Sequence, residues 1–138
     1  MVGIPCLRAG EPEFVSSGDP DTAPVIAVVD DDEDVRTAMG DLLMSLGYSA
    51  RMFETADAFL LSDRQPHINC VISDVQMPGT NGLQLARLMR LAKVPIILIT
   101  AFPTPEIERQ AEGAKVRKLL VKPFDSRDLI AELDLLRL

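Results

Sequence analysis

The sequence has little of the chemistry on which many metal sites and enzymes depend. It holds one histidine and two cysteines, Cys6 and Cys70, in 138 residues. One histidine leaves too few groups for a histidine-based metal site or a catalytic triad. Two cysteines do not make a disulfide framework. Cys70 lies in an apolar run, where we expect a buried and inert thiol.

Long apolar runs and an excess of positive charge are also missing. No apolar stretch reaches the roughly 20 residues of a transmembrane helix. The start lacks the basic-then-apolar order of a signal peptide, so we expect a cytoplasmic protein. The formal net charge is −7, which disfavours binding of this chain to nucleic acid or to an anionic membrane. The length and the 47% apolar content suit one globular domain.

The chain divides into two regions of different composition. Residues 1–23 carry three glycines, three prolines and four acids against one arginine, with no helical or strand period. This composition predicts a flexible N-terminal tail. Residues 24–138 show regular apolar patterning, and we expect them to form the folded domain.

Five short apolar runs alternate with helical patterns in the second region. The predicted strands are residues 25–29, 49–53, 70–73, 96–99 and 119–121. The predicted helices run from Val35 to Leu46, after a cap at Thr55, over 82–91, over 105–112 and after Asp125. This alternation implies parallel strands with helices on both faces. The expected fold class is therefore α/β, with one doubly wound five-stranded parallel sheet and five helices.

Polar residues follow four of the predicted strands directly. Asp30 and Asp31 follow the first strand, Asp74 the third, Thr100 the fourth and Lys122 the fifth. Ligands of such sheets bind beyond the carboxyl ends of the strands, so we expect these side chains to converge in one crevice. Clustered carboxylates repel one another. Mg²⁺, which binds carboxylate, water and phosphate oxygens, would offset that repulsion.

This set of residues fits phosphoryl transfer. A carboxylate is a known covalent acceptor, and the transfer needs positioning and charge stabilisation more than other help. Asp74 stands alone on the middle strand, so we expect it to be the nucleophile. Asp30 and Asp31 would hold the metal, and Thr100 and Lys122 would cover the oxygens of the moving group.

Four pieces of the sequence resemble the response-regulator receiver domains of two-component signalling. They are Val28-Val29-Asp30-Asp31, Ser73-Asp74-Val75-Gln76-Met77-Pro78, Leu98-Ile99-Thr100-Ala101 and Val121-Lys122-Pro123-Phe124. They occur in order, each at the end of a predicted strand. The Thr-Ala-Asp-Ala-Phe-Leu stretch at 55–60 resembles the receivers of FixJ-type regulators. The resemblance covers about residues 24–138.

The resemblance implies a flavodoxin-like receiver fold and a set of metal ligands. Mg²⁺ would be bound by Asp31, Asp74 and the backbone carbonyl of Gln76, with Asp30 nearby. A cis peptide bond between residues 122 and 123 is also implied, since X-Pro bonds adopt this form at low cost.

The resemblance further implies the partners of the chain. A sensor histidine kinase or a phosphotransfer protein would donate the phosphoryl group, and the phosphorylated chain would change its binding to an output domain or form a homodimer. Such a domain is not an enzyme beyond its own phosphorylation and dephosphorylation. The chain ends after the fifth predicted helix, so we expect either a stand-alone receiver or a piece of a longer regulator.

Three features depart from the family pattern. Leu119 stands where family members often carry an aromatic residue, three positions before the lysine. The pair Gly113-Ala114 comes earlier than usual. The segment from Asp74 to Thr100 is slightly short, so we expect a trimmed helix or exit loop there.

Two alternative functions stay open. Asp30-x-Asp32 after an apolar strand resembles the haloacid-dehalogenase phosphatases, in which Asp30 would be the nucleophile and Asp32 the acid–base. Against this, Asp34 stands where Thr or Val is expected, no acidic pair follows Lys122, and Asp74 would have no role. The second alternative is a receiver-like interaction module that is never phosphorylated.

Overall fold

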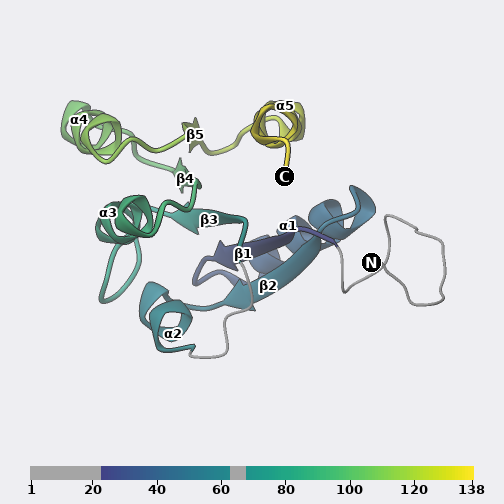
Figure 1. Cartoon of the computed structure of the whole chain (residues 1–138). Helices are drawn as coiled ribbons and strands as arrows, with labels where there is room; N and C mark the ends of the chain where they lie inside the picture. The colour runs from purple at the N-terminus through teal and green to yellow at the C-terminus, as the bar shows by residue number, and fades with distance from the viewer. Residues whose placement is uncertain (1–22, 63–67) are drawn as a thin grey trace, which may run out of the picture.

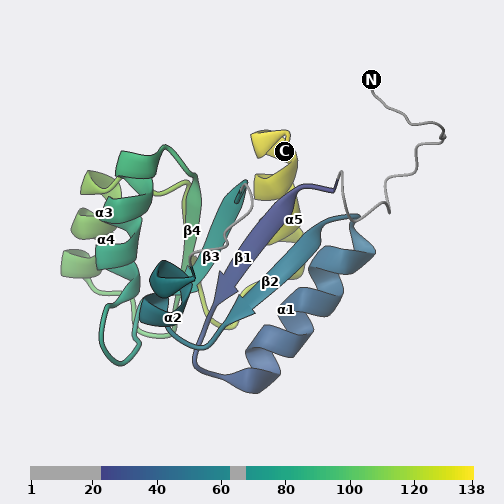
Figure 2. The ribbon, with the colours of Figure 1, turned by 60° about the horizontal axis from the view of Figure 1, so that its bottom comes forward.

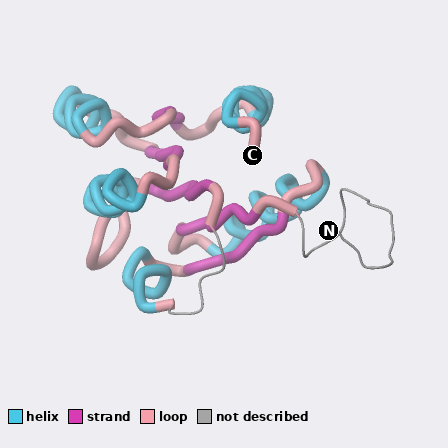
Figure 3. The backbone as a smooth tube through the Cα atoms, viewed as in Figure 1, coloured by secondary structure: helices cyan, strands magenta, loops and turns pink. Residues whose placement is uncertain are grey.

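The structure, a computed structural model, describes residues 23–62 and 68–138. Within these residues, five strands and five helices alternate along the chain. Figure 1 and Figure 3 show this alternation. The strands are β1 (Val25–Val29), β2 (Ser49–Phe53), β3 (Cys70–Asp74), β4 (Ile96–Thr100) and β5 (Lys118–Val121). The helices are α1 (Glu33–Ser45), α2 (Ala56–Leu61), α3 (Gly82–Ala92), α4 (Pro105–Gly113) and α5 (Ser126–Leu136).

The strands form one sheet in the order β2-β1-β3-β4-β5. Every neighbouring pair is parallel, so all five carboxyl ends meet at one edge of the sheet (Figure 2). This is the flavodoxin-like order, and its topological switch point lies between β1 and β3. There Val29 of β1 is in register with Ser73 of β3. The residues that follow these two positions, Asp30 and Asp74, therefore become neighbours.

Helices cover both faces of the sheet, with α2, α3 and α4 on one side and α1 and α5 on the other (Figure 1). Successive residues of β1 point to opposite faces. Ala27 and Val29 join the apolar cluster under α2, α3 and α4, whereas Ile26 and Val28 join the cluster under α1 and α5. Because both faces are covered, the central strands read as continuous apolar runs. This explains why they were recognisable in the sequence.

The fold class and the order of elements predicted from the sequence are confirmed. The predicted helix ends also have local causes. The Thr55 hydroxyl accepts a hydrogen bond from the Ala58 N–H at 3.0 Å, and Asp125 accepts one from the Arg127 N–H at 2.9 Å. Gly47, after α1, has a φ of 94°, which glycine adopts without a steric penalty. Asp74 and Thr100 are the last residues of β3 and β4 rather than the first residues of the following loops.

The predicted N-terminal tail falls, up to residue 22, outside the described residues, so this prediction remains an expectation. Within the described ranges, no helix has the length and apolar character needed to span a membrane.

Candidate functional site

The buried polar residues of the described chain gather at the carboxyl edge of the sheet. They are Asp30, Ser73, Asp74 and Thr100, with exposed fractions of 2%, 0%, 8% and 0%. Burying a carboxylate is costly unless it is paired or hydrogen-bonded. The Ser73 hydroxyl donates a hydrogen bond to the neighbouring backbone oxygen of Asp74 at 2.9 Å, so it serves the strand end. The other three residues are the ones for which a functional role was predicted.

Three carboxylates meet at this edge. Asp30, Asp31 and Asp74 each offer an oxygen, and these oxygens lie within 4.8 Å of one another. Asp31 is exposed, whereas Asp30 and Asp74 are buried, so the cluster opens to solvent on one side. Oxygen donors with room for water and phosphate oxygens are what Mg²⁺ requires. The three side chains therefore fit the metal that the sequence suggested.

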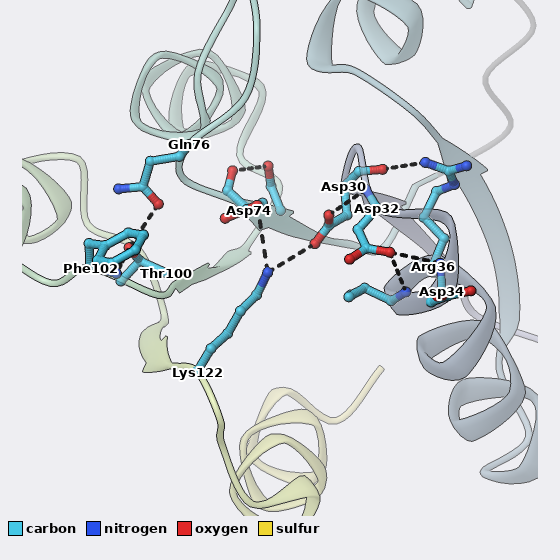
Figure 4. Close-up of polar contacts among 11 residues, drawn as sticks. Asp30, Asp32, Asp34, Arg36, Asp74, Gln76, Thr100, Phe102 and Lys122 are labelled. Carbon is cyan, nitrogen blue, oxygen red and sulfur yellow. Dashed lines mark hydrogen bonds and ion pairs between the residues drawn. The ribbon is translucent and has the colours of Figure 1, made fainter.

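Lys122, the residue directly after β5, brings a positive charge into this cluster. Its Nζ lies 3.6 Å from Asp30 Oδ2 and 3.6 Å from Asp74 Oδ2, as Figure 4 shows. The Lys122 N–H donates to the Thr100 carbonyl at 2.8 Å, which holds its backbone beside β4. The predicted cis peptide bond between Lys122 and Pro123 is present. One ammonium group is thus shared between two carboxylates.

The surroundings of Asp74 disfavour the ionised form of its carboxyl group. Burial raises the pKa of its carboxyl group, and the neighbouring Asp30 raises it further. Lys122 and a backbone hydrogen bond with Gln76 act in the opposite direction, but the pKa stays above its ordinary value. Burial and a like charge both disfavour the ionised form. A cation bound at the cluster would stabilise the ionised form. A shifted pKa of this kind is typical of functional sites.

Asp30 is held in place by Asp32, the residue before α1, and by Arg36 of α1. Its Oδ1 accepts a hydrogen bond from the Asp32 N–H at 2.9 Å, and its backbone oxygen accepts one from Arg36 Nη1 at 2.6 Å. Asp32 in turn caps α1 by accepting from the Asp34 N–H at 2.9 Å. The sequence did not predict these roles for Asp32 and Arg36. Asp32 had a usable signal, because an Asp before an acidic first turn is a preferred N-cap.

Thr100 is joined to the site through Gln76. Its hydroxyl donates to Gln76 Oε1 at 3.0 Å and accepts from the Phe102 N–H at 3.1 Å. Figure 4 shows Gln76 and Thr100 on the Asp74 side of the cluster. Only the backbone carbonyl of Gln76 was predicted to matter, and its role as a metal ligand remains a prediction. The contact made by its side chain had no signal in the sequence.

Comparison with known proteins identifies the family of this chain. A sequence profile described as the response regulator receiver domain matches residues 26–134. The transcriptional regulatory protein TdiR of Thauera aromatica is 36% identical over 110 residues, which cover 78% of this chain and 48% of that protein. The transcriptional regulatory protein FixJ of Bradyrhizobium diazoefficiens is 34% identical over 113 residues, covering 79% and 54%. The chain spans about half the length of these curated relatives.

Solved structures give the same result. A response regulator receiver protein from Pseudomonas putida superposes with a TM-score of 0.76 and 28% identity, covering 82% of this chain and 97% of that one. The response regulator StyR superposes with a TM-score of 0.72 and 32% identity, covering 83% and 59%. The profile match over most of the chain, with relatives above 30% identity, shows that this chain belongs to the response regulator receiver domains of two-component systems.

Proposed function

We propose that this domain is a phosphorylated switch and that Asp74 accepts the phosphoryl group. The observation that supports this most is the setting of Asp74. Its carboxylate is buried at the end of β3, beside Asp30 and 3.6 Å from the ammonium of Lys122. The Asp74 carboxylate is one of several negative charges at this edge of the sheet, and its pKa is raised. It can act as a nucleophile when a cation offsets the charges around it.

Asp30, Asp31, Asp74 and the backbone carbonyl of Gln76 would hold Mg²⁺. When bound, the metal supplies positive charge that offsets the charge on the phosphoryl oxygens. A carboxylate oxygen of Asp74 would form the new bond to phosphorus while the bond to the donor's histidine nitrogen breaks. The Asp32 N–H and Arg36, which bond Asp30, would keep the metal-binding oxygens in position.

Lys122 and Thr100 would bind oxygens of the phosphoryl group and so stabilise the phosphorylated state. Lys122 is already 3.6 Å from Asp74 Oδ2, so a phosphoryl oxygen attached there would lie within reach of its ammonium group. Thr100 would exchange its bond to Gln76 for a bond to another phosphoryl oxygen. Groups that bind the phosphorylated state more strongly than the unmodified state bias the domain towards it.

The phosphatase alternative with Asp30 as nucleophile has less support. One oxygen of Asp30 accepts the Asp32 N–H and the other faces Lys122. Asp32, the required acid–base, uses its Oδ1 to cap α1. A group engaged in a helix cap is poorly placed to exchange protons with a substrate. The never-phosphorylated alternative is also less favoured, because every residue that the chemistry needs is present.

The partners follow from the family and its relatives. We infer that a sensor histidine kinase or a phosphotransfer protein donates the group in the cytoplasm. The named relatives are transcriptional regulatory proteins about twice as long as the matched region. An output domain or protein that responds to the phosphorylated state, or a homodimer formed in that state, would complete the signal.

Intact-mass spectrometry after incubation with acetyl phosphate and Mg²⁺ tests the proposal. Wild type should gain one acid-labile phosphoryl group. Asp74→Asn should gain none, and Asp31→Ala should lose the Mg²⁺ dependence together with most of the product. Asp41→Asn, which changes an exposed acid of α1, is the matched control and should behave as wild type. An adduct that persists in Asp74→Asn and disappears in Asp30→Asn would support the phosphatase alternative.

A further inference from the structure

The loop that follows Asp74 is tied to helix α2 by a side-chain hydrogen bond. The Thr80 hydroxyl donates to Asp57 Oδ1 at 2.6 Å, and the two residues are 23 positions apart in the chain. The loop, residues 76–80, includes Gln76, whose backbone carbonyl is a proposed metal ligand. Neither Asp57 nor Thr80 lies among the groups assigned to the metal or the phosphoryl group above.

The far end of this loop is fixed without help from α2. The Gly82 N–H donates to the Val75 carbonyl at 3.0 Å. A Cβ at Gly82 would lie 2.3 Å from the backbone oxygen of Asp74, so α3 begins in direct contact with the strand end. Asn81 and Gln84 exchange hydrogen bonds of 2.9 Å in a capping box. Residues 76–80 lie between these anchored positions, and Thr80 gives them a further attachment to α2.

Asp57 offers that support from an anchored element. Ala56, directly before it, and Phe59, two positions after it, are the buried residues of α2, with exposed fractions of 0% and 2%. The Phe59 ring also packs edge-to-face on Phe53 of β2, with ring centroids 5.2 Å apart. Gly79 has a φ of 74°, and a Cβ there would lie 2.6 Å from Asp57 Oδ2. Only glycine allows the carboxylate to come this close to the loop.

We propose that Asp57 and Thr80 are positioning residues that hold the loop after Asp74 in the geometry needed for Mg²⁺. This inference rests on the proposed function, because it assigns the Gln76 carbonyl to the metal. Within the loop, Met77 packs against the apolar cluster under α2, α3 and α4, whereas Gln76, Pro78 and Gly79 are exposed. A displacement of about 1 Å of a ligand group such as the Gln76 carbonyl would weaken a site. The hydrogen bond from Thr80 to Asp57 limits such a displacement of the loop.

The test is a set of threonine variants of the full chain. Thr80→Val removes the hydroxyl while keeping the shape of the side chain, and Thr80→Ser retains the hydroxyl. Thr37→Val changes an exposed threonine of α1 and is the matched control. We expect Thr80→Val to weaken Mg²⁺ binding, measured by amide chemical-shift titration, by about threefold to tenfold. Thr80→Ser and Thr37→Val should bind as wild type.

Amide hydrogen exchange of the metal-free chain gives a second readout that does not depend on phosphorylation. Exchange at residues 76–80 should become several-fold faster in Thr80→Val, while exchange in β1, β3 and β4 stays unchanged. Wild-type Mg²⁺ affinity with unchanged loop exchange in Thr80→Val would overturn the inference. If wild type itself binds no Mg²⁺, the proposed function fails. Faster loop exchange in Thr80→Val would then support the contact, without a role in metal binding.

Discussion

The hydroxyl of Thr100 donates its hydrogen bond to the side-chain oxygen of Gln76, 3.0 Å away. A threonine hydroxyl has one proton to donate, so Thr100 cannot keep this bond and also donate to a phosphoryl oxygen on Asp74. The side chain of Gln76 would thus compete with a phosphoryl group on Asp74 for the Thr100 hydroxyl. The same residue offers its backbone carbonyl to the proposed metal, and a side-chain substitution leaves that carbonyl in place.

Gln76→Ala should therefore favour the modified state. We expect it to tighten binding of beryllium trifluoride, a phosphoryl mimic, in the presence of Mg²⁺ by about threefold to tenfold, the worth of one released hydrogen bond. In a Thr100→Val background the same substitution should have no effect, because no hydroxyl is left to release. Calorimetric titration of the four proteins checks this. Equal affinity of wild type and Gln76→Ala would show that the two groups do not compete.

Asp74→Asn should stabilise the metal-free domain at neutral pH. The folded-state pKa of Asp74 is raised above its ordinary value of 3.8, so between these two values the folded chain holds more protons on this group than the unfolded chain. The resulting destabilisation is absent below the unfolded pKa and complete above the folded one. Urea unfolding at pH 7 should show a gain of about 1 kcal/mol in the free energy of unfolding.

The gain in the free energy of unfolding from Asp74→Asn should shrink as the pH falls towards 3.8, because the Asp74 carboxyl group of wild type then becomes neutral as well. Asp41→Asn, on the exposed side of α1, is the control and should change stability little at any pH. A gain that does not vary with pH would point to a cause other than charge.

Lys122→Met should destabilise the metal-free domain. It removes the ammonium group that lies 3.6 Å from both Asp30 and Asp74 and leaves two buried carboxylates without it. A loss of about 1 kcal/mol is expected, since the lysine is partly exposed. Mg²⁺ should raise the melting temperature of the variant more than that of wild type, because it supplies the missing charge. Lys118→Met, at an exposed lysine of β5, should show neither effect in thermal unfolding.

Cys70 should be inert in the folded chain. Burial raises the pKa of its thiol from 9.0 to about 12, so the reactive thiolate is about a thousandfold less abundant at pH 8. In a Cys6→Ser variant, which isolates this thiol, alkylation by iodoacetamide should be at least a hundredfold slower in the native state than in urea. Similar rates in the two states would mean that the strand opens readily.

Much of the fold is predictable because its three central strands are buried on both faces. A run such as residues 96–99 has no alternation, and the helices between the runs carry a distinct apolar period. The polar residue that ends each run is easy to recognise, which is how Asp74 and Thr100 were identified as site residues. Parallel order then places all carboxyl ends at one edge. Local caps such as Thr55 follow from their own sequence positions.

The apolar runs and the polar residues after them are visible in the sequence, and they indicate which groups can take part in the chemistry. The tertiary structure decided which of them meet. The strand order puts β1 beside β3, so Asp30 and Asp74 become neighbours although β2 lies between them in the chain. The contacts of the loop after Asp74 with the end of β4, from Gln76 to Thr100, and with α2, from Thr80 to Asp57, follow no sequence period. They depend on where the packed helices and strands bring each loop, and only the folded chain sets those positions.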